Sequence, residues 1–236
     1  SGAISYGTMT MFLSLSGSLT GTLNQLVSLV PTAISLTTSA GRLMDILGMP
    51  KEDYSDAEHA EKFYEENREN GISLCISKMS YTYHNGTKVF MRADFEAHPH
   101  EIVALVGPSG EGKTTLLRIM LALLHIQSGD EDLVGAKTGE VLTITPAARR
   151  LFSYVPQGNT MFSGTIAENM RNVRPDATDE EIKEVLIVSC AWEFVQKLPD
   201  GIYSKVGERG VGFSEGQAQR LSIARALLRR APILLL

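Results

Sequence analysis

One nine-residue stretch constrains this chain more than any other. Residues 107–115 read GPSGEGKTT, which fits the pattern G-x-x-x-x-G-K-[ST] of a phosphate-binding loop. The apolar run before it, residues 101–106, predicts a buried strand, and residues 116–124 are apolar with good helix formers. A strand, a glycine-rich loop and a helix in this order predict an α/β fold that binds a nucleotide triphosphate. The alternative, an ordinary glycine turn before a helix, is disfavoured by these flanking elements.

Each part of the loop has a chemical task. The glycines let the backbone curl so that successive N–H groups point inward, where the helix N-terminus also faces. Lys113 supplies a positive charge for the β- and γ-phosphates, and the Thr114 hydroxyl is placed to coordinate Mg²⁺. The predicted nucleotide-contacting residues of the loop are Gly107, Pro108, Ser109, Gly110, Glu111, Gly112, Lys113, Thr114 and Thr115.

The charge balance argues against nucleic acid as a partner. The formal net charge is −5, whereas a protein that binds a phosphate backbone needs a basic face. Cys75 and Cys190 lie far apart in the sequence, and we expect two small buried thiols rather than a disulfide. For the histidine pair of residues 98–100, a polar turn is favoured over a metal site.

The first 48 residues have a different composition from the rest. No charged side chain precedes Arg42, and residues 9–36 mix Leu, Met, Val and Ile with Ser, Thr and Gly. The stretch is long enough for a membrane span, which needs about 20 residues, but small and hydroxyl residues interrupt it. A membrane helix packed against other helices is favoured over a polar, low-complexity surface segment or a soluble core helix. Arg42 then places that end of the helix on the cytoplasmic side.

A boundary follows this segment. Residues 51–70 are rich in Glu and Asp, so we interpret residues 49–71 as a solvated acidic linker with transient helix around residues 57–67. From residue 72 the apolar residues alternate, and Asn85-Gly86 is a strong hairpin signal. An antiparallel β layer is therefore predicted before the phosphate loop.

Two further stretches suggest ligand contacts. Residues 151–155 predict a second buried strand that is followed by Gln157, a candidate Mg²⁺ or water ligand because ligands bind at the carboxyl ends of core strands. Ser214 and Gln217 have capping-box spacing and open a helix that runs to about residue 230, with Gly216 permitting close approach. For this helix end, a second anion site and a plain capped helix both remain open.

Other patterns complete the outline. Residues 139–144 predict a short strand, and the pairs Thr165/Glu168 and Thr178/Glu181 predict two more capped helices. Apolar spacing predicts one helix over residues 179–197. Residues 231–236 begin a buried strand.

Taken together, these motifs resemble an ABC transporter half of the exporter type. The matching segments are Walker A (107–115), the Q-loop (154–157), the X-loop (206–210), the signature (213–217), the A-loop aromatic Tyr83 and the hydrophobic half of Walker B (233–236). The resemblance implies an α/β P-loop NTPase core with an antiparallel β layer and a helical subdomain, preceded by a long transmembrane helix. Its domains are the last transmembrane helix at 1–48, the linker at 49–71 and the nucleotide-binding domain at 72–236.

The resemblance also implies a mechanism. Two such domains sandwich two ATP molecules with Mg²⁺, and hydrolysis drives transport of an unidentified substrate through a membrane, with the nucleotide-binding domain in the cytoplasm. Tyr83 stacks on adenine. Ser214, Gly216 and Gln217 contact the nucleotide of the other half, identical or different. Lys113 and Gln157 are the catalytic candidates, and Thr114 and Gln157 the metal ligands.

Some features depart from the family pattern. Phe213 and Glu215 replace the usual Leu and Gly of the signature, which can weaken that site. The Walker B aspartate, the catalytic glutamate and the switch histidine are expected after Leu236, so this stretch alone should bind nucleotide but scarcely hydrolyse it. A soluble ABC ATPase acting as a mechanical or regulatory module is the alternative. The signature and X-loop together disfavour a small-molecule kinase.

Overall fold

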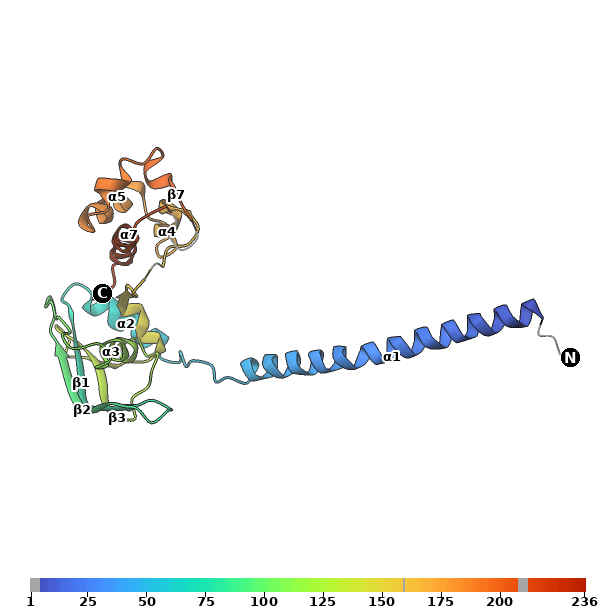
Figure 1. Ribbon diagram of the computed structural model, residues 1–236. Coiled ribbons are helices and arrows are strands. Elements are labelled where there is room, and N and C mark those ends of the chain that lie inside the picture. The colour runs from blue at the N-terminus through green and yellow to red at the C-terminus, as the bar shows by residue number, and fades with distance from the viewer. Residues whose placement is uncertain (1–4, 159, 208–211) are drawn as a thin grey trace. The chain divides into compact units, whose positions relative to one another are not determined.

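The computed structural model describes residues 5–158, 160–207 and 212–236 (Figure 1). The chain divides into two compact units, Ser1–Glu52 and Asp53–Leu236.

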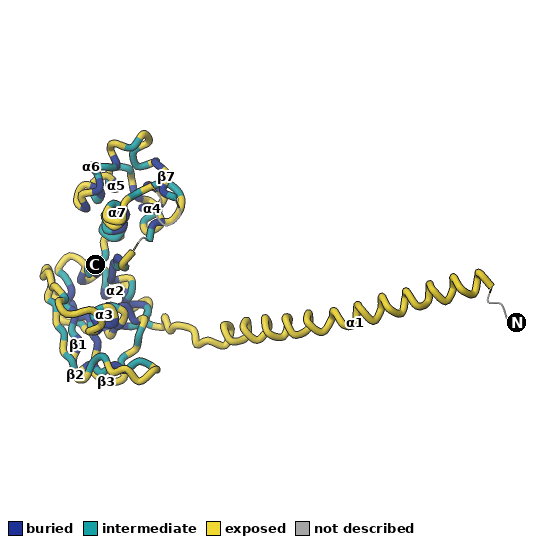
Figure 2. The backbone as a smooth tube through the Cα atoms, in the orientation of Figure 1, coloured by how far each residue is buried: buried dark blue, intermediate teal, exposed yellow. Residues whose placement is uncertain are grey.

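The first unit is one long helix, α1 (Tyr6–Leu47), as the sequence predicts. The Ser5 side chain caps it by accepting from the backbone N–H of Thr8, and all of its residues are exposed within this chain (Figure 2). Many of its hydroxyl groups donate to carbonyl oxygens one turn earlier in the same helix, so these groups are satisfied internally. They are Thr10, Thr20, Thr22, Ser28, Thr32, Thr37 and Thr38.

The length and composition of α1 bear on the predicted membrane span. Within the described ranges, no helix is both long and apolar enough to cross a membrane. The transmembrane helix at residues 1–48 stays a prediction.

The second unit contains the predicted antiparallel β layer. Its strands are β1 (Ile72–Thr82), β2 (Lys88–Ala97), β3 (Ser128–Gly135) and β4 (Val141–Thr143), in the order β2-β1-β3-β4. The hairpin between β1 and β2 turns at Gly86, whose φ of 86° suits glycine. The inward side chains of β1, including Ile72, Leu74 and Ile76, are buried in the main core.

The acidic segment contributes to this core as well. Residues 57–67 form helix α2 (Ala57–Asn67), in which Ala60 and Phe63 are fully buried. Asn67 is also buried, where its amide donates to Phe63 O at 3.0 Å and accepts from Thr138 Oγ1 at 3.0 Å. The interpretation as a solvated linker with transient helix is therefore wrong for residues 57–67, which form a helix packed into the core. The charges of α2 lie on one face, and its few apolar residues form a second face that packs.

The strand predicted at residues 101–106 is absent from the described structure. Ile102 is 97% exposed and Val106 91% exposed, and no described strand pairs with this segment. A buried strand needs neighbours that satisfy its backbone groups, and the apolar run lacks them here. Among the described strands, parallel pairing is limited to β5 (Phe152–Tyr154) and β8 (Ile233–Leu235).

A second core lies among short helices. These elements are α4 (Ile166–Arg171), α5 (Asp179–Val188), α6 (Trp192–Val195), α7 (Glu215–Leu228), β6 (Gly164–Thr165), β7 (Lys205–Val206) and η2 (Gly201–Tyr203). All three predicted capping boxes are present, at the starts of α4, α5 and α7. The 3-10 helix η1 (Pro146–Leu151) leads into β5.

The helix predicted over residues 179–197 is interrupted. Cys190 adopts a left-handed conformation with φ of 56°, and the Ala191 N–H donates to Leu186 O at 2.8 Å. This hydrogen bond closes the end of α5 in the manner of a Schellman motif, so α6 starts as a separate turn. Both cysteines are free thiols, as expected, but Cys190 is exposed and Cys75 only half-buried rather than buried.

Candidate nucleotide-binding site

The phosphate loop has a backbone that requires glycine. Gly110 and Gly112 have φ values of 93° and 91°, and Gly112 is the N-cap of helix α3 (Lys113–Met120). A Cβ atom added at Gly112 would lie 2.5 Å from Cγ1 of Val89 and 3.0 Å from Cζ of Phe90, both on β2. Strand β2 therefore packs directly against the last turn of the loop, and a larger residue would not fit.

Lys113 holds the loop in its curled form. Its Nζ donates to the carbonyl oxygens of Gly107 at 2.7 Å and Pro108 at 2.6 Å. The ammonium group thus lies over the loop itself, next to the first turn of α3. The neighbouring Thr114 is exposed at this helix start, whereas Thr115 is buried. A cation, an exposed hydroxyl and free helix N–H groups thus occur together, and this donor set suits an anion.

The structure brings Tyr83 to the same place. Tyr83 directly follows β1, and its hydroxyl lies 2.9 Å from Thr115 Oγ1 on α3. Its ring meets Tyr81 edge to face, with centroids 5.1 Å apart. Tyr83 is only half-buried. The predicted aromatic platform and the phosphate loop are therefore neighbours in space.

Arg149 of η1 fixes the other end of α3, a role that sequence reasoning missed. Its guanidinium donates from Nε to Leu121 O at 2.6 Å and from Nη2 to Ala122 O at 2.7 Å. These carbonyls lie just past the C-terminus of α3, where a cation interacts favourably with the helix dipole. An arginine after Pro-Ala-Ala gives no local signal of this role, because its partners lie 27 and 28 residues earlier in the chain.

Gln157 lies at the end of a core strand, as predicted. It follows β5, and the ladder extends past β5 through a hydrogen bond from Val155 N to Leu235 O at 2.9 Å. The side chain is exposed. Within the described ranges no hydrogen bond joins Gln157 to the phosphate loop, so its role as a metal ligand stays a prediction.

The start of α7 is an open, capped helix end. Gln217 N donates to Ser214 Oγ at 3.3 Å, and Ser214 N donates to Gln217 Oε1 at 2.9 Å. Gly216 is exposed, and a Cβ added there would meet no atom within 4 Å. The part of the chain that the structure describes shows no hydrogen bond between these residues and the phosphate loop. Of the predicted X-loop at 206–210, residues 208–210 lie outside the described residues.

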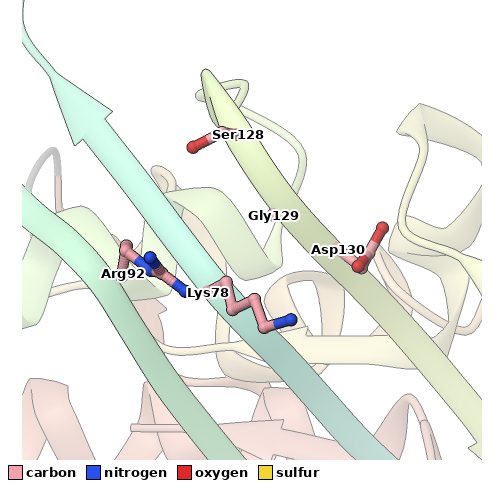
Figure 3. A pocket seen from close by; sticks show the side chains of 5 residues that line it. All are labelled: Lys78, Arg92, Ser128, Gly129 and Asp130. Carbon is pink, nitrogen blue, oxygen red and sulfur yellow. The ribbon is translucent and has the colours of Figure 1, made fainter.

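A pocket of about 360 Å³ lies elsewhere, on the β layer (Figure 3). Its lining residues are Lys78, Arg92, Ser128, Gly129 and Asp130. The exposed Lys78 and Arg92 sit at irregular points of β1 and β2, with φ values of 51° and 53°. Asp94 accepts a hydrogen bond from Lys78 N at 2.7 Å. Two carboxylates thus balance two cations, which leaves no net charge to attract an anion.

Comparison with known proteins points to one family. Residues 90–236 match the family model described as ABC transporter. A putative export ATP-binding/permease protein of Rickettsia felis is 36% identical over 181 residues, which is 74% of this chain and 30% of the relative. The mitochondrial iron-sulfur clusters transporter ATM1 of Debaryomyces hansenii is 38% identical over 68% of this chain and 23% of its own. A multidrug resistance ABC transporter ATP-binding and permease protein of Lactococcus lactis is 32% identical over 91% of this chain and 36% of its own.

The solved structures agree with these relatives. A bacterial Atm1-family ABC exporter with ATP bound matches with a TM-score of 0.63 and 30% identity, over 70% of this chain and 28% of that chain. This chain thus spans between about a quarter and about a third of the proteins it matches. Because the family model covers more than half of the residues and carries the phosphate loop, the chain belongs to the ABC transporter family.

Proposed function

We propose that this chain forms the ATP-binding part of an exporter and works with magnesium ion. The observation that carries the proposal is the hydrogen bond between the Tyr83 hydroxyl and Thr115, which places an aromatic ring beside the phosphate loop. ATP needs both an aromatic surface for its base and donors for its phosphates. Family membership supports ATP binding independently.

The loop residues fit a triphosphate chemically. The N–H groups of residues 107–115 would hold the phosphates, with Lys113 as the point charge. Thr114 and Gln157 would hold Mg²⁺, which supplies charge neutralisation at the phosphates when bound. The only carboxylate within the loop is that of Glu111, which is exposed. The loop is therefore free of buried negative charge that would repel the ligand.

The helix end at Ser214 has a separate task in this proposal. Its exposed first turn would contact the nucleotide held by a second ABC half, through Ser214, Gly216 and Gln217. The amide N–H groups and the dipole of α7 favour negative charge there. Because the turn is exposed in this chain, a partner domain has access to it. Closure of the two halves on ATP, followed by hydrolysis in the complete protein, would drive transport.

Residues 1–48 would belong to the membrane part of the complete exporter, with the second unit in the cytoplasm. The match to the Lactococcus lactis protein covers 91% of the chain, so it reaches into α1. The serine and threonine hydroxyls of α1 bond their own backbone, which lowers the cost of packing this helix among other helices and lipid. The transported substrate is left unassigned.

The test is ATP binding by the complete protein, measured by calorimetry in detergent. Lys113→Ala should abolish binding, since the loop loses its positive charge. The matched control Lys137→Ala removes an exposed lysine from the turn after β3 and should bind as the wild type does. Equal affinity of the wild type and the Lys113→Ala variant would refute the proposed function.

A further inference from the structure

Helix α7 contacts the chain on both sides of Gln157. Before Gln157, the buried Ser153 of β5 donates from Oγ to Ala226 O at 2.9 Å. After Gln157, Arg225 donates from Nη1 to Thr160 O at 3.0 Å and from Nη2 to Thr160 Oγ1 at 2.8 Å. These contacts bracket the segment that carries the proposed metal ligand.

The Arg225 contact is stronger than a surface hydrogen bond. Its guanidinium reaches the carbonyl and the hydroxyl of the same residue, which the fixed fork of arginine can do and lysine cannot. The Thr160 hydroxyl is shared with Ser222 Oγ at 3.1 Å, one turn earlier on α7. Burial lowers the pKa of Arg225, and its guanidinium also lies over the ring of Phe162, 5.6 Å from the ring centroid. Arg225 is half-buried, and its two hydrogen bonds to Thr160 hold this part of the chain against α7.

The other end of α7 is the open turn at Ser214. The helix has 14 residues, which makes it roughly 21 Å long at 1.5 Å per residue. Its buried face includes Ala218, Leu221, Ala224 and Leu228, the last three of which belong to the second core. Because one continuous, capped helix joins the turn at Ser214 to Arg225, we expect a displacement at Ser214 to reach Arg225.

We propose that Arg225 is a positioning residue that sets the Gln157 segment through Thr160. Contact between a second ABC half and the first turn of α7 would thereby adjust the metal ligand of the chain's own nucleotide site. This inference rests on the proposed function, since it needs Gln157 near Mg²⁺. In this proposal Arg225 acts through Thr160 and does not contact the nucleotide.

The test is metal affinity in the complete protein. Electron paramagnetic resonance measures Mn²⁺ binding in the presence of a non-hydrolysable ATP analogue, and calorimetry measures the analogue alone without metal. Arg225→Lys should weaken Mn²⁺ binding about tenfold, a typical cost of losing a residue that orients a ligand. Affinity for the metal-free analogue should stay within about twofold of the wild-type value. Arg230→Lys is the matched control, since Arg230 is exposed and donates to Glu181 instead.

Thr160→Val tests the same contact from the other side. It removes the hydroxyl that Arg225 and Ser222 share, and should weaken Mn²⁺ binding as Arg225→Lys does. The double variant should be no weaker than the worse single one. Unchanged Mn²⁺ affinity in Thr160→Val, or an equal loss of metal-free analogue binding in both variants, would overturn the proposal. Lys113→Ala separates the two hypotheses, because its failure to reduce nucleotide binding would refute the proposed function instead.

Discussion

Glu131 is a buried carboxyl group without a full set of partners. It lies on β3, is 8% exposed, and its Oε2 has no hydrogen-bond partner in the described structure. Burial, together with a smaller effect of the nearby Asp132, raises its pKa from 4.5 to about 7. The fold therefore prefers the protonated form, whereas the unfolded chain ionises near pH 4.5.

This preference makes the folded chain less stable as pH rises. Because the folded state binds the proton more tightly, the contribution is fully present below pH 4.5 and is lost as pH rises through about 7. The full shift corresponds to about 3 kcal/mol at about 1.4 kcal/mol per unit, and we expect about 1–2 kcal/mol because solvent and structural relaxation reduce it. Glu131→Leu replaces the carboxyl by an apolar side chain, two residues before the buried Leu133 on the same face.

The assay is urea unfolding of the chain at about pH 5 and about pH 8, followed by circular dichroism. The variant should be more stable than the wild type at the higher pH by about 1–2 kcal/mol, with a smaller difference at the lower pH. Glu180→Leu, at an exposed position of α5, is the control and should show no such pH-dependent difference. An identical pH profile in the wild type and Glu131→Leu would refute the reasoning.

Three further predictions concern the site. Gly112→Ala should lower the free energy of unfolding by about 1–3 kcal/mol, because the backbone is strained and the Val89 side chain is close. Adding Val89→Ala to this variant should restore only part of the lost free energy, as measured by urea unfolding. Tyr83→Ala should weaken ATP binding in the complete protein by about 1–3 kcal/mol if the ring stacks on adenine, whereas Tyr83→Phe, which keeps the ring and loses the bond to Thr115, should retain most of the affinity in calorimetry. Glu215→Gly should raise ATP turnover of the complete exporter if this carboxylate faces phosphate; an unchanged rate would mean that it points away.

Local signals in the sequence were reliable where the partners are also local. The capping boxes opening α4, α5 and α7 each need only residues three apart, and all three form. The Asn85-Gly86 turn likewise depends on its own backbone, and it joins β1 to β2. Such features are decided before any tertiary contact.

The features that the sequence did not predict correctly depend on residues far away in the chain. Residues 101–106 have the composition of a buried strand, yet a strand forms only beside another one, and none of the described strands pairs with them. The burial of Phe63 was not predicted, because the segment 57–67 is mostly acidic and the core that buries Phe63 comes from later strands. The contacts of Arg149 and Arg225 join segments 27 and 65 residues apart. A short stretch of sequence therefore does not contain both residues of either contact.

The hydroxyl groups of α1 have a consequence for whatever surrounds this helix. Each of the seven side chains that bonds its own backbone has its donor engaged, so it offers a neighbouring helix only its acceptor oxygen. Under the proposed function, neighbouring helices in the complete exporter would recognise α1 by the shape of its surface. Small residues such as Gly17 and Gly21 alternate there with large leucines. If α1 packs by shape, replacing threonine with valine along this helix should disturb the packing far less than replacing glycine with leucine.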